Sequence, residues 1–181
     1  MEFENLLDPS FDSAFAARPS LPWWPWVGSR FSTSAVRTMV VGESVYNWGE
    51  GFDARYKQTD GLRETHRRHA LNYRRDSPYV RNIERAIYRA SEPSEEQKRA
   101  LWSTVAYHNL VLQPLMSIKK RPTYAQYLNG WHEFFELSHL MAVDQAIVYG
   151  LDQRIQIGGP NEAIHRGRGP QASYAASRMP R

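Results

Sequence analysis

A short apolar run that ends abruptly in polar residues constrains the fold of this chain most. The run over residues 36–41 is rich in valine and is followed at once by Gly42-Glu43-Ser44-Val45-Tyr46. This pattern predicts a buried strand with polar groups at its carboxyl end. A second run, residues 104–108, leads directly to Asn109. Because open α/β sheets bind ligands at the carboxyl ends of their strands, we expect the two turns to share one pocket.

Segments with helical periodicity alternate with the apolar runs. Ser77-Pro78 supplies an N-cap and a first-turn proline for an amphipathic helix over residues 78–90. Capping boxes predict a short helix that starts after Ser94 and ends near Leu101, and a long aromatic helix over residues 124–139. Residues 144–149 form a third apolar run. The alternation predicts an α/β fold in three layers, with a short, mostly parallel sheet flanked by helices.

The chain of 181 residues, 41% of them hydrophobic, suits one domain. We expect an irregular segment over residues 1–35 that packs on the domain, an α/β domain over 36–150 and a disordered basic tail over 151–181. The tryptophans of residues 23–26 are interpreted as packing over the sheet edge, with a base-stacking platform as the alternative. With no long apolar run and no signal sequence, we expect a cytoplasmic protein that does not enter a membrane.

The net charge of +4 is unevenly distributed. Residues 151–181 hold five arginines against two acids, so the rest of the chain carries a net charge of only +1. Two local clusters of bases, Arg63, Arg67, Arg68, Arg74 and Arg75 and then Lys119-Lys120-Arg121, predict either phosphate contacts or a solvated surface. The chain has no cysteine, and His66 and His69 lack a third ligand, so no metal site is predicted.

Six short motifs follow one another along residues 22–151. They are Pro25-Trp26-Val27-Gly28, Val40-Val41-Gly42-Glu43-Ser44-Val45-Tyr46, residues 102–114, Arg121-Pro122-Thr123, residues 131–135, and Ile147-Val148-Tyr149-Gly150. In this order and spacing they resemble the uracil-DNA glycosylase superfamily, and they are most similar to a largely uncharacterised bacterial branch of it. The resemblance implies a glycosylase-like α/β fold. It also implies DNA repair chemistry without a cofactor: hydrolysis of the N-glycosidic bond of a deaminated or damaged base in DNA.

The resemblance also implies catalytic residues. The superfamily's first motif, G-Q-D-P-Y-H in one class and G-E-A-P-G in another, matches the turn that holds Glu43 and Ser44. Glu43 would orient or activate the attacking water, a role that needs a carboxylate. Its alternative role is to cap backbone amides at the strand end. Ser44 stands where one class places its catalytic aspartate, and a hydroxyl without a base activates water poorly.

Base recognition falls, by the same resemblance, to Asn109, whose carboxamide can both donate to a base carbonyl and accept from the adjacent ring N–H. A loop-capping role is the alternative for Asn109. Tyr46 would pack against the base, and Trp48 or Phe52 would stack on its face. The phosphate contacts would come from Arg67, Arg68, Lys119, Lys120 and Arg121.

One departure from the superfamily leaves other functions open. After the third strand, superfamily members usually continue with a helix and a fourth strand that leads to an H-P-S-type loop, whereas this chain has only its Gly/Pro/Arg-rich tail. The chain could therefore be a non-catalytic module that binds a nucleobase or nucleic acid, single-stranded DNA included, or a degenerate member. A sheet without its last strand also exposes a pairing edge, which predicts a homodimer through that edge.

Overall fold

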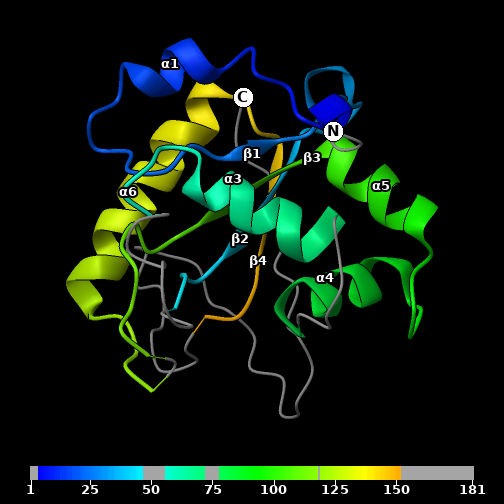
Figure 1. Cartoon of the computed structure of the whole chain (residues 1–181). Coiled ribbons are helices and arrows are strands. Elements are labelled where there is room, and N and C mark those ends of the chain that lie inside the picture. The colour runs from blue at the N-terminus through cyan, green and yellow to red at the C-terminus, as the bar shows by residue number, and fades with distance from the viewer. Residues whose placement is uncertain (1–3, 47–55, 72–77, 118, 152–181) are drawn as a thin grey trace, which may run out of the picture.

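The computed structural model describes residues 4–46, 56–71, 78–117 and 119–151 (Figure 1). Four strands form one sheet in the order β1-β3-β2-β4. They are β1 (Trp26–Val27), β2 (Thr38–Gly42), β3 (Val105–Asn109) and β4 (Gln145–Val148). The three apolar runs thus form three strands, as predicted, and the α/β class is confirmed.

The sheet is mixed because β1 differs from the other strands. β2 pairs in parallel with β3 on one side and with β4 on the other, while β1 pairs antiparallel with β3. Every residue of β2 and β3 is buried, whereas the residues of β4 are half-buried. A central β2 covered on both faces explains why its sequence is a continuous apolar run rather than an alternating one.

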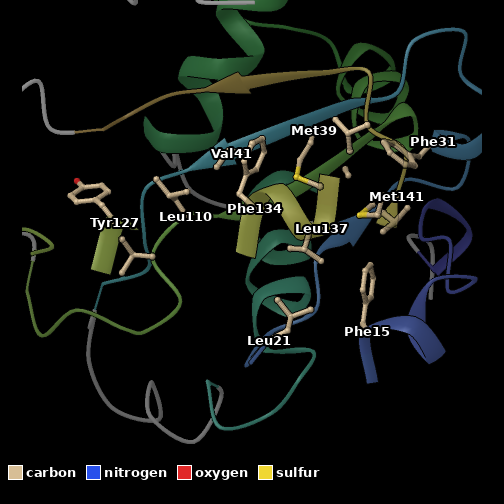
Figure 2. Close-up of a cluster of buried hydrophobic side chains, with 14 residues drawn as sticks. Phe15, Leu21, Phe31, Met39, Val41, Leu110, Tyr127, Phe134, Leu137 and Met141 are labelled. Atoms are coloured by element: carbon tan, nitrogen blue, oxygen red, sulfur yellow. The ribbon is translucent and has the colours of Figure 1, made fainter. Parts of the chain in front are cut away.

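Helices cover both faces of the sheet. On one face Val40 and Tyr107 pack against helices α3 (Gly61–His66), α4 (Pro78–Tyr88) and α5 (Glu95–Thr104). On the other face α6 (Tyr124–Leu140) lies over β2, with α1 (Asp12–Ala16) beside it. Figure 2 shows this second core, in which Phe134 and Leu137 of α6 lie close to Met39 and Val41.

Two of the predicted helix starts are confirmed in detail, while the N-cap predicted at Ser77 lies outside the described residues. Ser94 and Thr123 are the N-caps of α5 and α6, and each forms a complete capping box with the glutamine three residues on. The helix after Ser94 is longer than predicted: instead of ending near Leu101 it runs to Thr104 and passes directly into β3. Tertiary packing extends it, because Leu101 and Trp102 are buried in the core between α4 and the sheet.

The N-terminal segment contributes regular structure that the sequence did not predict. It holds the short 3-10 helices η1 (Glu4–Leu6) and η2 (Phe31–Thr33), helix α1 and strand β1. Trp26 is fully buried and donates from Nε1 to the carbonyl of Trp102, while Trp23 donates to the carbonyl of Tyr56. Burial leaves neither indole able to stack on a base, so the packing interpretation is confirmed for both.

A helix that the sequence did not predict follows residue 60. α3 continues into a π-helical turn, η3 (Arg67–Leu71). The segment is rich in charged residues, so the sequence does not show which face is buried. Arg63, one of these charged residues, is itself buried. Its guanidinium pairs with Asp12 at 2.7 Å and donates to the carbonyl of Pro25, so it serves the core rather than a phosphate.

Helix α6 touches backbone next to the end of β3. A Cβ placed on Gly130 would lie 1.9 Å from the carbonyl oxygen of Leu110, which directly follows Asn109. Only glycine allows the helix to approach this closely. Among the described residues, no helix combines the length and the apolar character needed to cross a membrane.

Candidate functional site

Glu43 is a buried carboxylate at the carboxyl end of β2. Its side chain accepts hydrogen bonds from Nη2 of Arg121 at 2.5 Å, from the hydroxyl of Tyr46 at 2.6 Å and from the hydroxyl of Tyr127. Only 4% of Glu43 is exposed. Burial of a carboxylate is costly unless it is paired and hydrogen-bonded, and these three donors meet that requirement.

Three separate parts of the chain supply the partners of Glu43. Tyr46 lies in the turn just after β2, Arg121 precedes α6 and Tyr127 lies in the first turns of that helix. Arg121 also reaches the carbonyl of Gly150 at 3.4 Å, so it links the ends of β2 and β4. Burial raises the pKa of the Tyr46 phenol, and the hydrogen bond to Glu43 raises it further. The phenol therefore stays protonated and donates at neutral pH.

Asn109 ends β3, beside the end of β2. It is 1% exposed, and its Oδ1 accepts a 2.8 Å hydrogen bond from the hydroxyl of Tyr107. The ring of Tyr107 in turn stacks on His66, with 4.7 Å between the ring centroids. Tyr107, itself packed on His66, therefore fixes the orientation of the Asn109 amide.

His66 lies at the centre of an aromatic cluster with Tyr107, Trp102 and Trp26. Its ring lies 4.3 Å from the centroid of Trp102 and 5.1 Å from that of Trp26. Burial lowers the pKa of His66 to about 3, with a smaller contribution from His69. His66 is therefore a neutral packing residue at physiological pH and not a proton donor.

Glu43 and Asn109 lie at the same edge of the sheet but on opposite faces. Gly42 pairs with Asn109 in the parallel ladder, so Glu43 lies one residue beyond that pair. The partner of Asn109, Tyr107, belongs to the core under α3 and α5, whereas the partner of Glu43, Tyr127, belongs to the core under α6. A ligand that contacts both groups must therefore lie beyond the strand ends.

The other predicted catalytic and base-binding residues have different settings. Ser44 is buried, and its hydroxyl makes no hydrogen bond with a described residue. No side chain therefore serves as its base within this part of the chain. Tyr46 is half-buried and directed at Glu43. Trp48 and Phe52 lie outside the described residues.

The predicted phosphate-binding residues occupy two places. Arg67 and Arg68 begin η3 and both approach Glu64, at 4.0 and 2.8 Å. Lys119 and Lys120 are exposed in the segment before α6. Arg121, next to them, is directed inward at Glu43, so of the three bases in this segment the two lysines are the ones open to a phosphate.

His108 is a buried polar residue that the sequence analysis did not single out. It lies on β3 between Tyr107 and Asn109, is 1% exposed, and neither ring nitrogen makes a hydrogen bond with a described residue. Burial lowers its pKa to about 4, against an opposing effect of Glu133. In the part of the chain that the structure describes, no three histidine or acidic side chains cluster as a metal site would require.

Comparison of the chain with family models, with curated proteins and with solved structures returned no match.

Proposed function

We propose that this chain is a DNA N-glycosylase of the uracil-DNA glycosylase type, acting at the carboxyl edge of β2 and β3. The observation that carries the proposal is the placement of a carboxylate, Glu43, and a carboxamide, Asn109, at the ends of two hydrogen-bonded parallel strands. Ligands of open α/β sheets bind at this edge. The sequence motifs resemble the superfamily, and this resemblance implies site roles for the same two residues.

In this proposal Asn109 reads the base and Glu43 positions the water. Water adds to C1′ of the sugar as the bond from C1′ to the base nitrogen breaks, which leaves an abasic site and the free base. Tyr46, which is already held by Glu43, packs beside the base. The exposed Lys119 and Lys120, with Arg67 and Arg68, contact DNA phosphates, and no cofactor takes part.

A second candidate function is recognition of a nucleobase without hydrolysis. It is favoured by the crowding of Glu43, whose two oxygens already accept from Arg121, Tyr46 and Tyr127. A carboxylate with three protein donors has little capacity left to hold or deprotonate water. Ser44, without a base, offers no replacement.

Single-turnover cleavage of uracil- and hypoxanthine-containing oligonucleotides, single- and double-stranded, tests both functions. The glycosylase proposal expects base release that falls by about 100-fold or more in Glu43→Gln and in Asn109→Ala. Matched controls are Glu96→Gln and Asn82→Ala, which change exposed residues of α5 and α4. Thermal unfolding checks that each variant is folded.

Each outcome of this assay has a definite meaning. Release that survives either site substitution would overturn the residue assignment. Binding of uracil or abasic DNA that depends on Asn109, without release, would replace the first function by the second. If the chain neither releases nor binds a base, both proposed functions are overturned.

A further inference from the structure

Helix α6 carries an apolar stripe that the described residues leave largely exposed. We define the α6 stripe as the four residues Tyr124, Leu128, Trp131 and Phe135. Tyr124, Leu128 and Phe135 are 69%, 56% and 58% exposed, and Trp131 is half-buried with its ring 6.1 Å from that of Phe135. Tyr124, Leu128 and Phe135 are among the most exposed large apolar side chains of the described residues.

The spacing of the stripe is that of a helix–helix seam. Its members are separated by four, three and four residues, which is the a/d spacing of a heptad repeat. They flank the buried face that Tyr127, Phe134 and Leu137 turn to the sheet. Trp131 packs partly against that core, whereas the core leaves Tyr124, Leu128 and Phe135 exposed on an adjacent side of α6.

The charge of α6 narrows the class of partner. The helix contains no lysine or arginine, and its two acids are both tied to Arg18: Glu133 at 2.8 Å and Glu136 at 3.6 Å. A nucleic acid needs basic side chains, and so does a helix that lies on an anionic membrane surface. The stripe instead fits a protein surface that is equally neutral and aromatic.

The area of the stripe matches the apolar part of a modest dimer interface. If a fully exposed aromatic side chain offers about 200 Å², Tyr124, Leu128 and Phe135 together expose roughly 350 Å². A standard interface buries about 800 Å² on each partner, a little over half of it apolar. The stripe thus supplies most of the apolar surface that one side of such an interface needs.

We propose that the chain forms a homodimer in which α6 packs antiparallel against α6 of a second copy. A two-fold axis brings the same patch together from both copies, so a neutral heptad stripe is its own complement. The proposal places the interface on α6 and not on the outer edge of β4, and it does not depend on the glycosylase proposal.

The first experiment measures the oligomeric state by sedimentation over a wide range of chain concentration. Leu128→Glu and Phe135→Glu each place a carboxylate in the stripe and should raise the dimer dissociation constant by about 30-fold or more, as loss of an interface hot spot does. The matched control is Val36→Glu, which changes an apolar residue that is 49% exposed in the segment before β2. It should leave the dissociation constant unchanged.

The second experiment uses the absence of cysteine from the sequence. Leu128→Cys, His132→Cys and Val36→Cys each create a single thiol for a short bismaleimide crosslinker. Crosslinked dimer is expected from the two α6 positions and not from position 36. These mild substitutions keep the proposal testable if a glutamate variant does not fold.

Three results would overturn the proposal. They are a monomer at every concentration, a dimer that both glutamate variants leave intact, and crosslinking at position 36 without crosslinking on α6. The first of these would also be the result if another part of the same chain covered the stripe.

Discussion

The hydroxyl of Tyr107 donates a 2.8 Å hydrogen bond to Oδ1 of Asn109, and both side chains are buried. Because the phenol holds Oδ1, the orientation of the Asn109 amide is fixed. Tyr107 is in this sense a positioning residue for Asn109. His66, stacked against the Tyr107 ring, holds the phenol in place from the other side.

Replacement of Tyr107 by phenylalanine tests this relationship. Tyr107→Phe keeps the stacking on His66 but removes the donor, so the free energy of unfolding should fall by about 1 kcal/mol and nucleobase affinity by about fivefold. Chemical denaturation and a binding titration measure the two effects. Tyr124→Phe removes a phenol from an exposed position and should change neither. Equal losses in both variants would contradict the role given to Tyr107.

Removal of the Arg121 charge should destabilise the chain. In Arg121→Met, Glu43 keeps its two phenol donors but loses its countercharge, so the free energy of unfolding should fall by about 2 kcal/mol. Lys120→Met removes the same charge from the neighbouring exposed position and should stay within about 0.5 kcal/mol of the parent chain. Similar denaturation curves for the two variants would show that the pairing with Glu43 adds nothing.

Stability should fall in mild acid because two buried histidines resist protonation. Burial lowers the pKa of His66 to about 3 and of His108 to about 4, while both titrate near 6.5 when unfolded. Between these values the unfolded chain binds more protons, so each contributes stability that is complete above about pH 6.5 and is lost as the pH falls, by about 1.4 kcal/mol per unit. Denaturation curves measured from pH 7 to pH 4.5 check the slope.

Nuclear magnetic resonance separates these histidines from the carboxylates that also titrate in acid. The ring resonances of His66 and His108 should not move between pH 7.5 and pH 5.5 in the folded chain. A mid-range titration of either buried ring would contradict the prediction.

Gly130 should resist replacement even by the best helix former. Alanine is intrinsically favoured over glycine in a helix by about 1 kcal/mol, but the added Cβ of Gly130→Ala would overlap the carbonyl of Leu110. We expect a net loss of about 2 kcal/mol, as for other overpacked sites. Asn129→Ala, at the exposed neighbouring position, should instead stabilise the helix by a few tenths of a kcal/mol. Thermal or chemical denaturation of both variants measures the difference, and a stabilised Gly130→Ala would contradict the close packing.

The elements that could be predicted are those with a signal in their own local sequence. Ser94 and Thr123 announce their helices because a capping box needs only residues three apart. The buried strands β2 and β3 are visible because apolar runs are required by burial on both faces. β1 has two residues and only its pairing with β3 defines it, so no periodicity could reveal it. α3 was not predicted because Arg63, which is buried, carries a charge that is typical of a surface residue.

The positions of Glu43 and Asn109 at the ends of strands were predictable from the sequence, but their contacts were not. The run into Gly42-Glu43 and the run into Asn109 correctly place both residues at strand ends. That they face opposite sides follows from the register, in which Gly42 and not Glu43 pairs with Asn109, and register is a property of two strands together. Tyr127 lies in the predicted aromatic helix over residues 124–139, but its bond to Glu43 joins residues 84 positions apart and has no local signal.

The junction between α5 and β3 has a consequence for which changes of length the chain can accept. Thr104 ends the helix and Val105 begins the strand, with no connecting residue between them. One inserted or deleted residue would turn the helix by about 100° or exchange the two sides of the strand. Tyr107 and Asn109 would then be directed toward α6, and His108 toward α3. The number of residues between Ser94 and Asn109 is therefore constrained as strictly as the identity of the residues themselves.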